Sequence, residues 1–78
     1  MRETEVILSD YFVEDLNPDG DFTGNFRLIV GTSASTDGRI RIKPSEELYS
    51  PTQALQVATV MRDAGVKSPI EKTQEEAR

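Results

Sequence analysis

The chain contains no cysteine, no histidine and no tryptophan. Without cysteine it has neither a disulfide nor a thiolate metal ligand, and without histidine it lacks the most common general base near neutral pH. Triads that use histidine are excluded, and a chain of 78 residues has little room for a deep cleft. We therefore expect a protein that is not an enzyme and that needs no cofactor. The absence of cysteine fits a reducing compartment, so the expected location is the cytoplasm.

Long apolar runs are missing as well, and we expect no contact with a membrane. The opening Met-Arg-Glu-Thr-Glu lacks the basic-then-apolar order of a secretion signal. Hydrophobic residues make up only 36% of the chain. They are clustered rather than scattered, which favours one small compact core over a disordered chain.

Charge is distributed unevenly along a chain whose net charge is −5. Residues 1–26 hold seven acids and one arginine, whereas residues 27–43 hold four bases and one aspartate. The bases Arg39, Arg41 and Lys43 alternate with isoleucines, and we expect them to form a solvated sheet face. Because the chain is acidic and has few aromatic residues for stacking, direct nucleic-acid binding is not expected.

The sequence predicts three strands. The first is favoured by a run of β-branched and aromatic residues, although a short helix with Ser9 as its N-cap is an alternative for this segment. Asp37-Gly38 is a strong hairpin signal between the second and third strands. The strands are predicted at residues 4–13, 26–30 and 39–43.

One main helix is predicted after the strands. Ser50 and Gln53 have the spacing of a capping box, Pro51 suits the first turn, and Gly65 suits a left-handed stop after a helix that ends at about Ala64.

A second capping box begins at Ser68. The helix that it predicts has few apolar residues, so we expect it to fray unless something docks on it.

The predicted fold is α+β: a three-stranded antiparallel sheet with the main C-terminal helix on one face, followed by a short helical tail. Residues 1–66 would form the domain and residues 67–78 the tail. Ile7, Tyr11 and Val13 lack a partner in such a one-helix fold, so they would be covered by the tail, by another protein or by a second copy. The predicted core contains apolar residues of the strands and the helix, namely Val6, Leu8, Phe12, Phe26, Leu28, Val30, Ile40, Ile42, Leu55, Ala58 and Met61.

Residues 15–26 carry oxygen-bearing side chains at alternate positions, with a glycine in sixth place and an apolar residue in eighth. Over these twelve residues the chain resembles an EF-hand or dockerin-type calcium loop, but Phe26 stands where the bidentate glutamate belongs. A solvated turn is the alternative, because Pro, Gly, Asp and Asn are the residues that turns favour. The resemblance implies calcium ligands at Asp15, Asn17, Asp19, Asp21 and Thr23.

The predicted function is binding of another protein, as a regulator, inhibitor or accessory subunit. Docking would use an apolar strand face, and the acidic loop would steer the chain toward a basic partner. Two alternatives remain: an inhibitor that imitates the phosphates of DNA for a nucleic-acid-binding protein, and a calcium-binding loop at residues 15–26. The candidate contact residues are Tyr11, Asp15, Asp19, Asp21 and Phe22.

Overall fold

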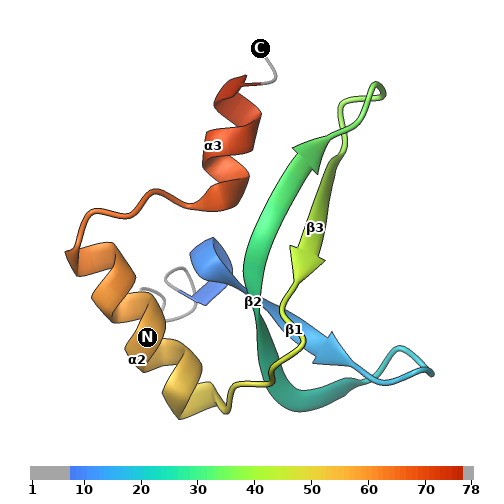
Figure 1. The fold of residues 1–78 in the computed structure, drawn as a ribbon. Coiled ribbons are helices and arrows are strands. Elements are labelled where there is room, and N and C mark those ends of the chain that lie inside the picture. The colour runs from blue at the N-terminus through green and yellow to red at the C-terminus, as the bar shows by residue number, and fades with distance from the viewer. Residues whose placement is uncertain (1–7, 77–78) are drawn as a thin grey trace.

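The computed structural model describes residues 8–76, which form a three-stranded antiparallel sheet with two helices packed against it (Figure 1). The strands lie in the order β1-β2-β3. The predicted α+β class is therefore confirmed. The elements are β1 (Phe12–Leu16), β2 (Phe22–Ala34), β3 (Ile40–Pro44), α2 (Pro51–Asp63) and α3 (Pro69–Glu76).

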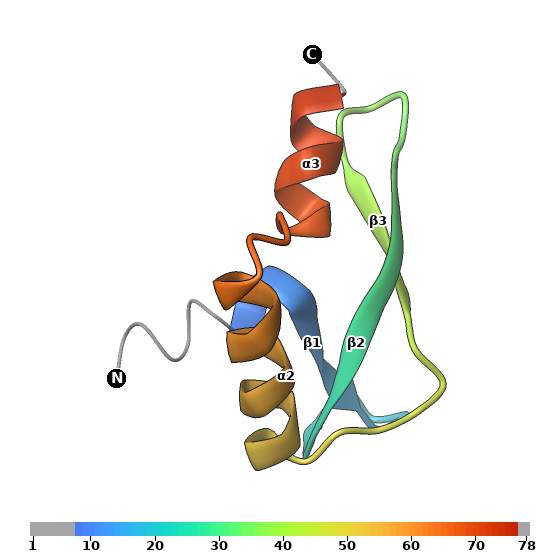
Figure 2. The ribbon, with the colours of Figure 1, turned by 60° about the vertical axis from the view of Figure 1, so that its left-hand side comes forward.

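The central strand, β2, is long enough to pair with two neighbours along different halves of its length. Residues 22–28 pair with β1, and residues 29–34 pair with β3. β2 curves strongly between its two hairpins, and both helices lie on the same side of it in Figure 2, with α2 below α3. This curvature gives each helix its own half of the sheet to pack on.

The first hairpin is longer than the sequence predicts. Instead of a loop over residues 14–25, β1 continues to Leu16, β2 begins at Phe22, and only residues 17–21 form the turn. The side-chain oxygen of Asn17 accepts hydrogen bonds from the backbone N–H groups of Asp19, at 3.0 Å, and Asp21, at 2.9 Å. Asparagine thus holds the turn through its own side chain, and residues on either side are free to pair as strands.

The strand predicted at residues 4–13 is wrong in part, because residues 8–11 are helical and β1 starts only at Phe12. Residues 4–7 lie outside the described part of the chain. Tertiary contacts explain the helical turn: the Tyr11 hydroxyl donates to the Val66 carbonyl oxygen, and the Ser68 hydroxyl donates to the Asp10 carbonyl oxygen at 2.8 Å. These contacts with the segment after α2 outweigh the local preference for a strand.

The core lies between α2 and the β1–β2 half of the sheet. Tyr11, Phe12, Ala54 and Ala58 are buried at its centre. Because the two alanines are small, the helix backbone comes close to the aromatic rings. Around this centre pack the partly buried Leu8, Phe26, Leu28, Tyr49, Val57 and Met61.

Val30 was predicted in the core, but its side chain is exposed, and Ile29 is buried instead. The cause is an irregularity in the β2–β3 register: Ile29 pairs with Pro44 and Gly31 with Lys43, so Val30 is an extra residue on β2. Side chains normally alternate between the two faces of a strand. Because Val30 is an extra residue, the alternation changes at this point, and Ile29 lies on the same face of β2 as Thr32. Val6, another predicted core residue, lies outside the described residues.

Helix α2 begins and ends where the sequence predicts. Ser50 and Gln53 form a reciprocal capping box, in which each side-chain oxygen accepts from the other residue's backbone N–H. Gly65 has φ +78°, and the N–H groups of Gly65 and Val66 donate back to carbonyl oxygens of the last turn. This is the Schellman arrangement, which favours glycine because of the left-handed backbone.

The expected C-terminal helix is present as α3, and it packs on the chain's own sheet. Thr73 of α3 is buried and its hydroxyl hydrogen-bonds the hydroxyl of Thr32 on β2. A salt bridge of 2.6 Å between Lys67 and Glu75 supports the helix from outside. The sheet thus supplies the docking surface that a helix with so few apolar residues needs.

Candidate functional site

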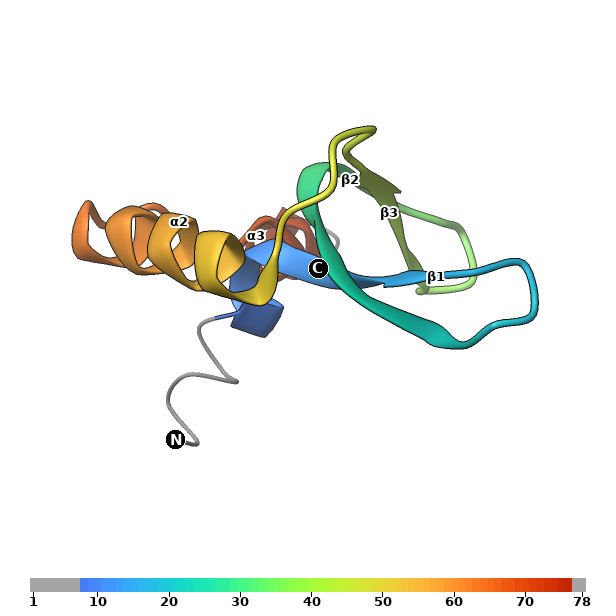
Figure 3. The ribbon, with the colours of Figure 1, turned by 90° about the horizontal axis from the view of Figure 1, so that it is seen from below.

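Two exposed apolar side chains lie opposite each other near the tip of the first hairpin. Leu16 of β1 pairs directly with Phe22 of β2, and these side chains are 55% and 47% exposed. The Phe22 ring meets the edge of the Phe26 ring, with 5.4 Å between centroids and 66° between planes. Figure 3 shows that the hairpin extends away from α2, so the helix that covers the core does not reach this end of the sheet.

The apolar surface continues from the hairpin into a hollow beside β1. This hollow has a volume of about 330 Å³ and is lined by Leu8, Ser9, Phe12, Glu14 and Phe26. Phe26 belongs both to the ring pair and to the hollow, and it joins the two. The apolar strip, as we call it below, comprises Leu8, Leu16, Phe22 and Phe26. Phe12 also lines the hollow, but it is buried and belongs to the core.

Acidic side chains border the apolar strip. Asp19 and Asp21 are exposed in the turn, and Glu14 is exposed on β1 directly opposite Phe26. Three of the predicted contact residues, Asp19, Asp21 and Phe22, are therefore brought together at one end of the molecule. An apolar centre with a charged rim is the usual composition of a protein-binding surface.

Asp15 has a structural place beside this surface. Thr23 Oγ1 donates to Asp15 Oδ2 at 2.7 Å, and Arg27 Nε donates to Asp15 Oδ1 at 2.7 Å. The hydrogen bonds from Thr23 and then Arg27 hold the pKa of the Asp15 carboxyl below its usual value. The side chain is buried and links β1 to β2, so it stabilises the hairpin that presents the apolar strip.

Tyr11 is not on this surface. Its side chain is only 3% exposed, and its hydroxyl is bonded to the Val66 carbonyl oxygen. Burial raises the pKa of the Tyr11 phenol. The residue is thus a core contact that fixes the segment between α2 and α3.

Several of the oxygen atoms expected to bind calcium take part in hydrogen bonds within the hairpin, although the Asp19 carboxylate does not. Those of Asp15 accept from Thr23 and Arg27, and that of Asn17 accepts from two backbone N–H groups of the turn. Within residues 8–76 no group of three or more acidic side chains lies where it could hold a metal ion. At Asp15 and Asn17 the residues that resemble a calcium loop also meet the needs of a tight hairpin turn. Calcium binding by residues 15–26 stays a prediction.

Leu16 was missed by the sequence analysis, and so was the role of Phe26 at the surface. The signal was present: Phe12 and Leu16 are four residues apart, as are Phe22 and Phe26, which places each pair on one face of a strand. The sequence analysis did not use this spacing, because it predicted a loop over residues 14–25, and in a loop the spacing does not indicate which side chains share a face.

No family model matches the chain, and no curated protein or solved structure matches it. Among the helices of residues 8–76, none has the length and apolar character needed to cross a membrane.

Proposed function

We propose that this protein is a non-enzymatic binding module that docks on a partner protein through the apolar strip. The exposed pair of Leu16 and Phe22, which rests on Phe26, is the observation that carries the proposal. These side chains lie beyond α2 and contribute little to the core. Each is already about half buried, so burial of its exposed half by a partner would yield about 1 kcal/mol, roughly half of the value for complete burial. The proposed location is the cytoplasm, on the basis of a chain without cysteine.

The chemistry of the rim specifies the partner further. Asp19 and Asp21 place negative charge at the tip of the hairpin, so the complementary surface has an apolar projection surrounded by lysine or arginine. Charges at the rim act mainly on the rate of association, while the apolar centre sets the lifetime of the complex. The strip is thus the affinity element and the turn the steering element.

Affinity capture with matched variants tests this function. Wild type, Phe22→Ala and Val60→Ala are used as baits in native lysate. Val60 is 68% exposed but lies on α2, from which the hairpin that carries Phe22 extends away (Figure 3). We expect wild type and Val60→Ala to retain the same partner and Phe22→Ala to lose it. With the purified partner, Phe22→Ala should raise the Kd about thirtyfold, as expected for a central aromatic contact.

Two results would contradict the proposal. Equal capture by all three baits would show that Phe22 takes no part in binding. A stable dimer of the purified chain that Phe22→Ala converts to monomer, measured by light scattering after gel filtration, would show that the strip binds a second copy instead. Circular dichroism of each variant establishes that a loss of binding is not a loss of fold.

A further inference from the structure

A second surface lies at the opposite edge of the sheet, on β3. Arg41 and Lys43 are exposed there. Within residues 8–76 neither side chain has an ion-pair or hydrogen-bond partner, whereas the side chains of Arg27, Arg39 and Lys67 each pair with an acid. In a chain with fourteen acidic residues, two neighbouring cations without a partner form an unused positive surface.

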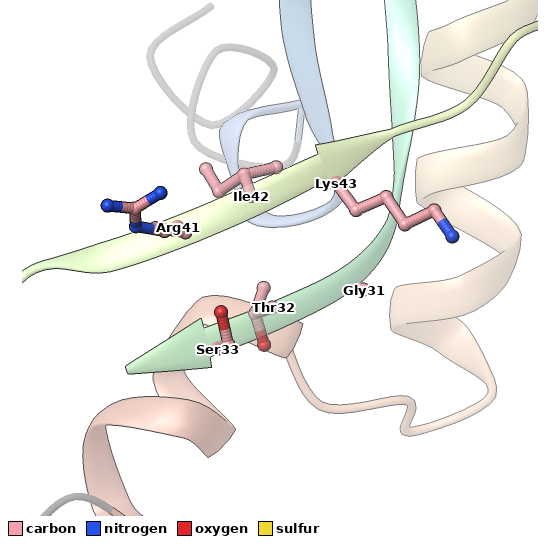
Figure 4. A pocket seen from close by; sticks show the side chains of 6 residues that line it. All are labelled: Gly31, Thr32, Ser33, Arg41, Ile42 and Lys43. Atoms are coloured by element: carbon pink, nitrogen blue, oxygen red, sulfur yellow. The ribbon is translucent and has the colours of Figure 1, made fainter. Parts of the chain in front are cut away.

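Small residues lie opposite both cations. In the β2–β3 register Lys43 faces Gly31 and Arg41 faces Ser33. Together with Thr32 and Ile42 these residues line a hollow of about 280 Å³. In Figure 4 the side chains of Arg41 and Lys43 point in opposite directions along β3. Because Gly31 has no side chain, it leaves the approach to Lys43 open.

The backbone beside these cations is also available for binding. In the sheet of the described residues β3 is an edge strand, and no strand pairs with its outer side. The Arg39 carbonyl oxygen accepts from the Ser35 N–H on the β2 side, at 2.8 Å. Antiparallel hydrogen bonding alternates, so Arg41 also directs its backbone groups to β2 while Ile40 and Ile42 direct theirs outward.

We propose that the outer edge of β3 binds an extended acidic segment of a protein, which adds a strand to the sheet and pairs its carboxylates with Arg41 and Lys43. Residues two apart on a strand are about 6.7 Å apart on either chain, so acids at alternate positions match the two cations. The same cations disfavour pairing of β3 with a second, equally charged β3. The edge therefore discriminates between incoming strands by their charge.

A peptide is a better occupant than a nucleic acid for two reasons. Only a peptide offers N–H and carbonyl groups that match the free groups of Ile40 and Ile42. The net charge of −5 repels a polyanion at long range, whereas a short acidic segment brings only a few charges. This edge is separate from the apolar strip, and the proposal does not depend on the function proposed for that strip.

The test uses the full chain and an eight-residue peptide in which glutamate and threonine alternate. We expect the peptide to shift the amide NMR signals of residues 40–43 with a Kd that rises with salt. Control ligands are the same peptide with lysine in place of glutamate, and a single-stranded oligonucleotide of equal charge. Binding of either control as tightly as the glutamate peptide, or shifts confined to the β1–β2 hairpin, would overturn the proposal.

Charge-reversal variants test whether the charges of Arg41 and Lys43 select the peptide. Arg41→Glu and Lys43→Glu should each weaken binding of the glutamate peptide by about tenfold, the equivalent of about 1.4 kcal/mol. Lys72→Glu, which changes the net charge equally at an exposed position of α3, should not weaken it. The double variant Arg41→Glu/Lys43→Glu should prefer the lysine peptide, with shifts at residues 40–43 in an amide spectrum that remains that of a folded chain. An unchanged preference would contradict the proposal. Phe22→Ala should bind the glutamate peptide as wild type does, so failure here and failure of the apolar strip are distinguishable.

Discussion

Asp15 and Arg27 join the first two strands through a salt bridge of 2.7 Å. The same arginine donates through Nη1 to the Ser45 carbonyl oxygen at 2.8 Å. Arg27 therefore connects β1, its own strand β2 and the segment that follows β3. One guanidinium group links three parts of the chain because its several donors are fixed in one plane.

This contact predicts a loss of stability in acid. Hydrogen bonds from Thr23 and Arg27 lower the pKa of Asp15 in the folded chain, so folding favours the ionised carboxylate. The stabilisation is complete above the unfolded-state pKa of about 3.9. It is lost as the pH falls through the lower folded-state pKa.

Urea denaturation at several pH values between about 6 and about 2 measures this effect. Asp15→Asn should be less stable than wild type at the upper end and should lose less stability toward the lower end. Thr23→Ala, which removes one of the two partners, should lie between them. If Asp15→Asn has the same pH dependence as wild type, the carboxylate is not the titrating group.

The core predicts a low tolerance for larger side chains on the inner face of α2. Ala58 is fully buried against the aromatic residues of the core, and Ala58→Leu should lower the free energy of unfolding by about 1–3 kcal/mol. Thr59→Leu places the same side chain on the exposed neighbouring position and serves as the control. Urea denaturation with equal effects of the two substitutions would mean that α2 does not pack as described.

The hydroxyl pair of Thr32 and Thr73 predicts a non-additive result. Thr32→Val leaves the buried Thr73 hydroxyl without its partner, which costs about 1–3 kcal/mol. Thr73→Val should cost less, because the Thr32 hydroxyl also donates to the Pro69 carbonyl oxygen at 3.3 Å. The double variant should cost less than the sum of the two single effects in a double-mutant cycle. Strict additivity would show that α3 does not contact β2 at this point.

The cap of α2 predicts a moderate effect at an exposed position. Ser50→Ala removes the side-chain acceptor for the Gln53 N–H and should lower the free energy of unfolding by about 1 kcal/mol. Thr52→Ala changes an exposed residue within the first turn and should be nearly neutral. Thermal unfolding of both variants, followed by circular dichroism, provides the comparison.

The elements governed by local signals could be predicted from the sequence. Ser50 and Gly65 mark the ends of α2 through capping geometry that involves only nearby residues. The second hairpin turn was predicted in the same way, from Asp37-Gly38, and Gly38 has φ +85°. In both cases the signal and the structure lie within a few residues of each other.

The errors arose where distant segments determine the conformation. The helical turn before Phe12 depends on contacts of Asp10 and Tyr11 with residues after α2, which no local pattern reveals. Val30 is exposed and Ile29 is buried, the reverse of the prediction, because of a bulge on β2. Since a strand alternates with a period of two, one extra residue reverses every assignment beyond it.

The candidate surface was predicted only in part. Phe22, Asp19 and Asp21 were identified from a mixture of apolar and acidic residues, and all three are exposed at the hairpin. Leu16 can be recognised as a surface residue of the hairpin only from the structure, in which β1 continues past Glu14. The wrong end predicted for the first strand is thus the reason that part of the apolar strip was missed.

The contacts of Tyr11 with Val66 and of Ser68 with Asp10 join positions 55 and 58 residues apart. During synthesis on the ribosome, both hairpins can form as soon as residue 44 has emerged, but the ring of Tyr11 has no shelter until α2 and the segment beyond it have followed. We therefore expect the hairpins to form early and the closure of this long loop to limit the folding rate. A nascent chain halted before residue 51 would lack α2, keep its aromatic core in water and be prone to aggregation.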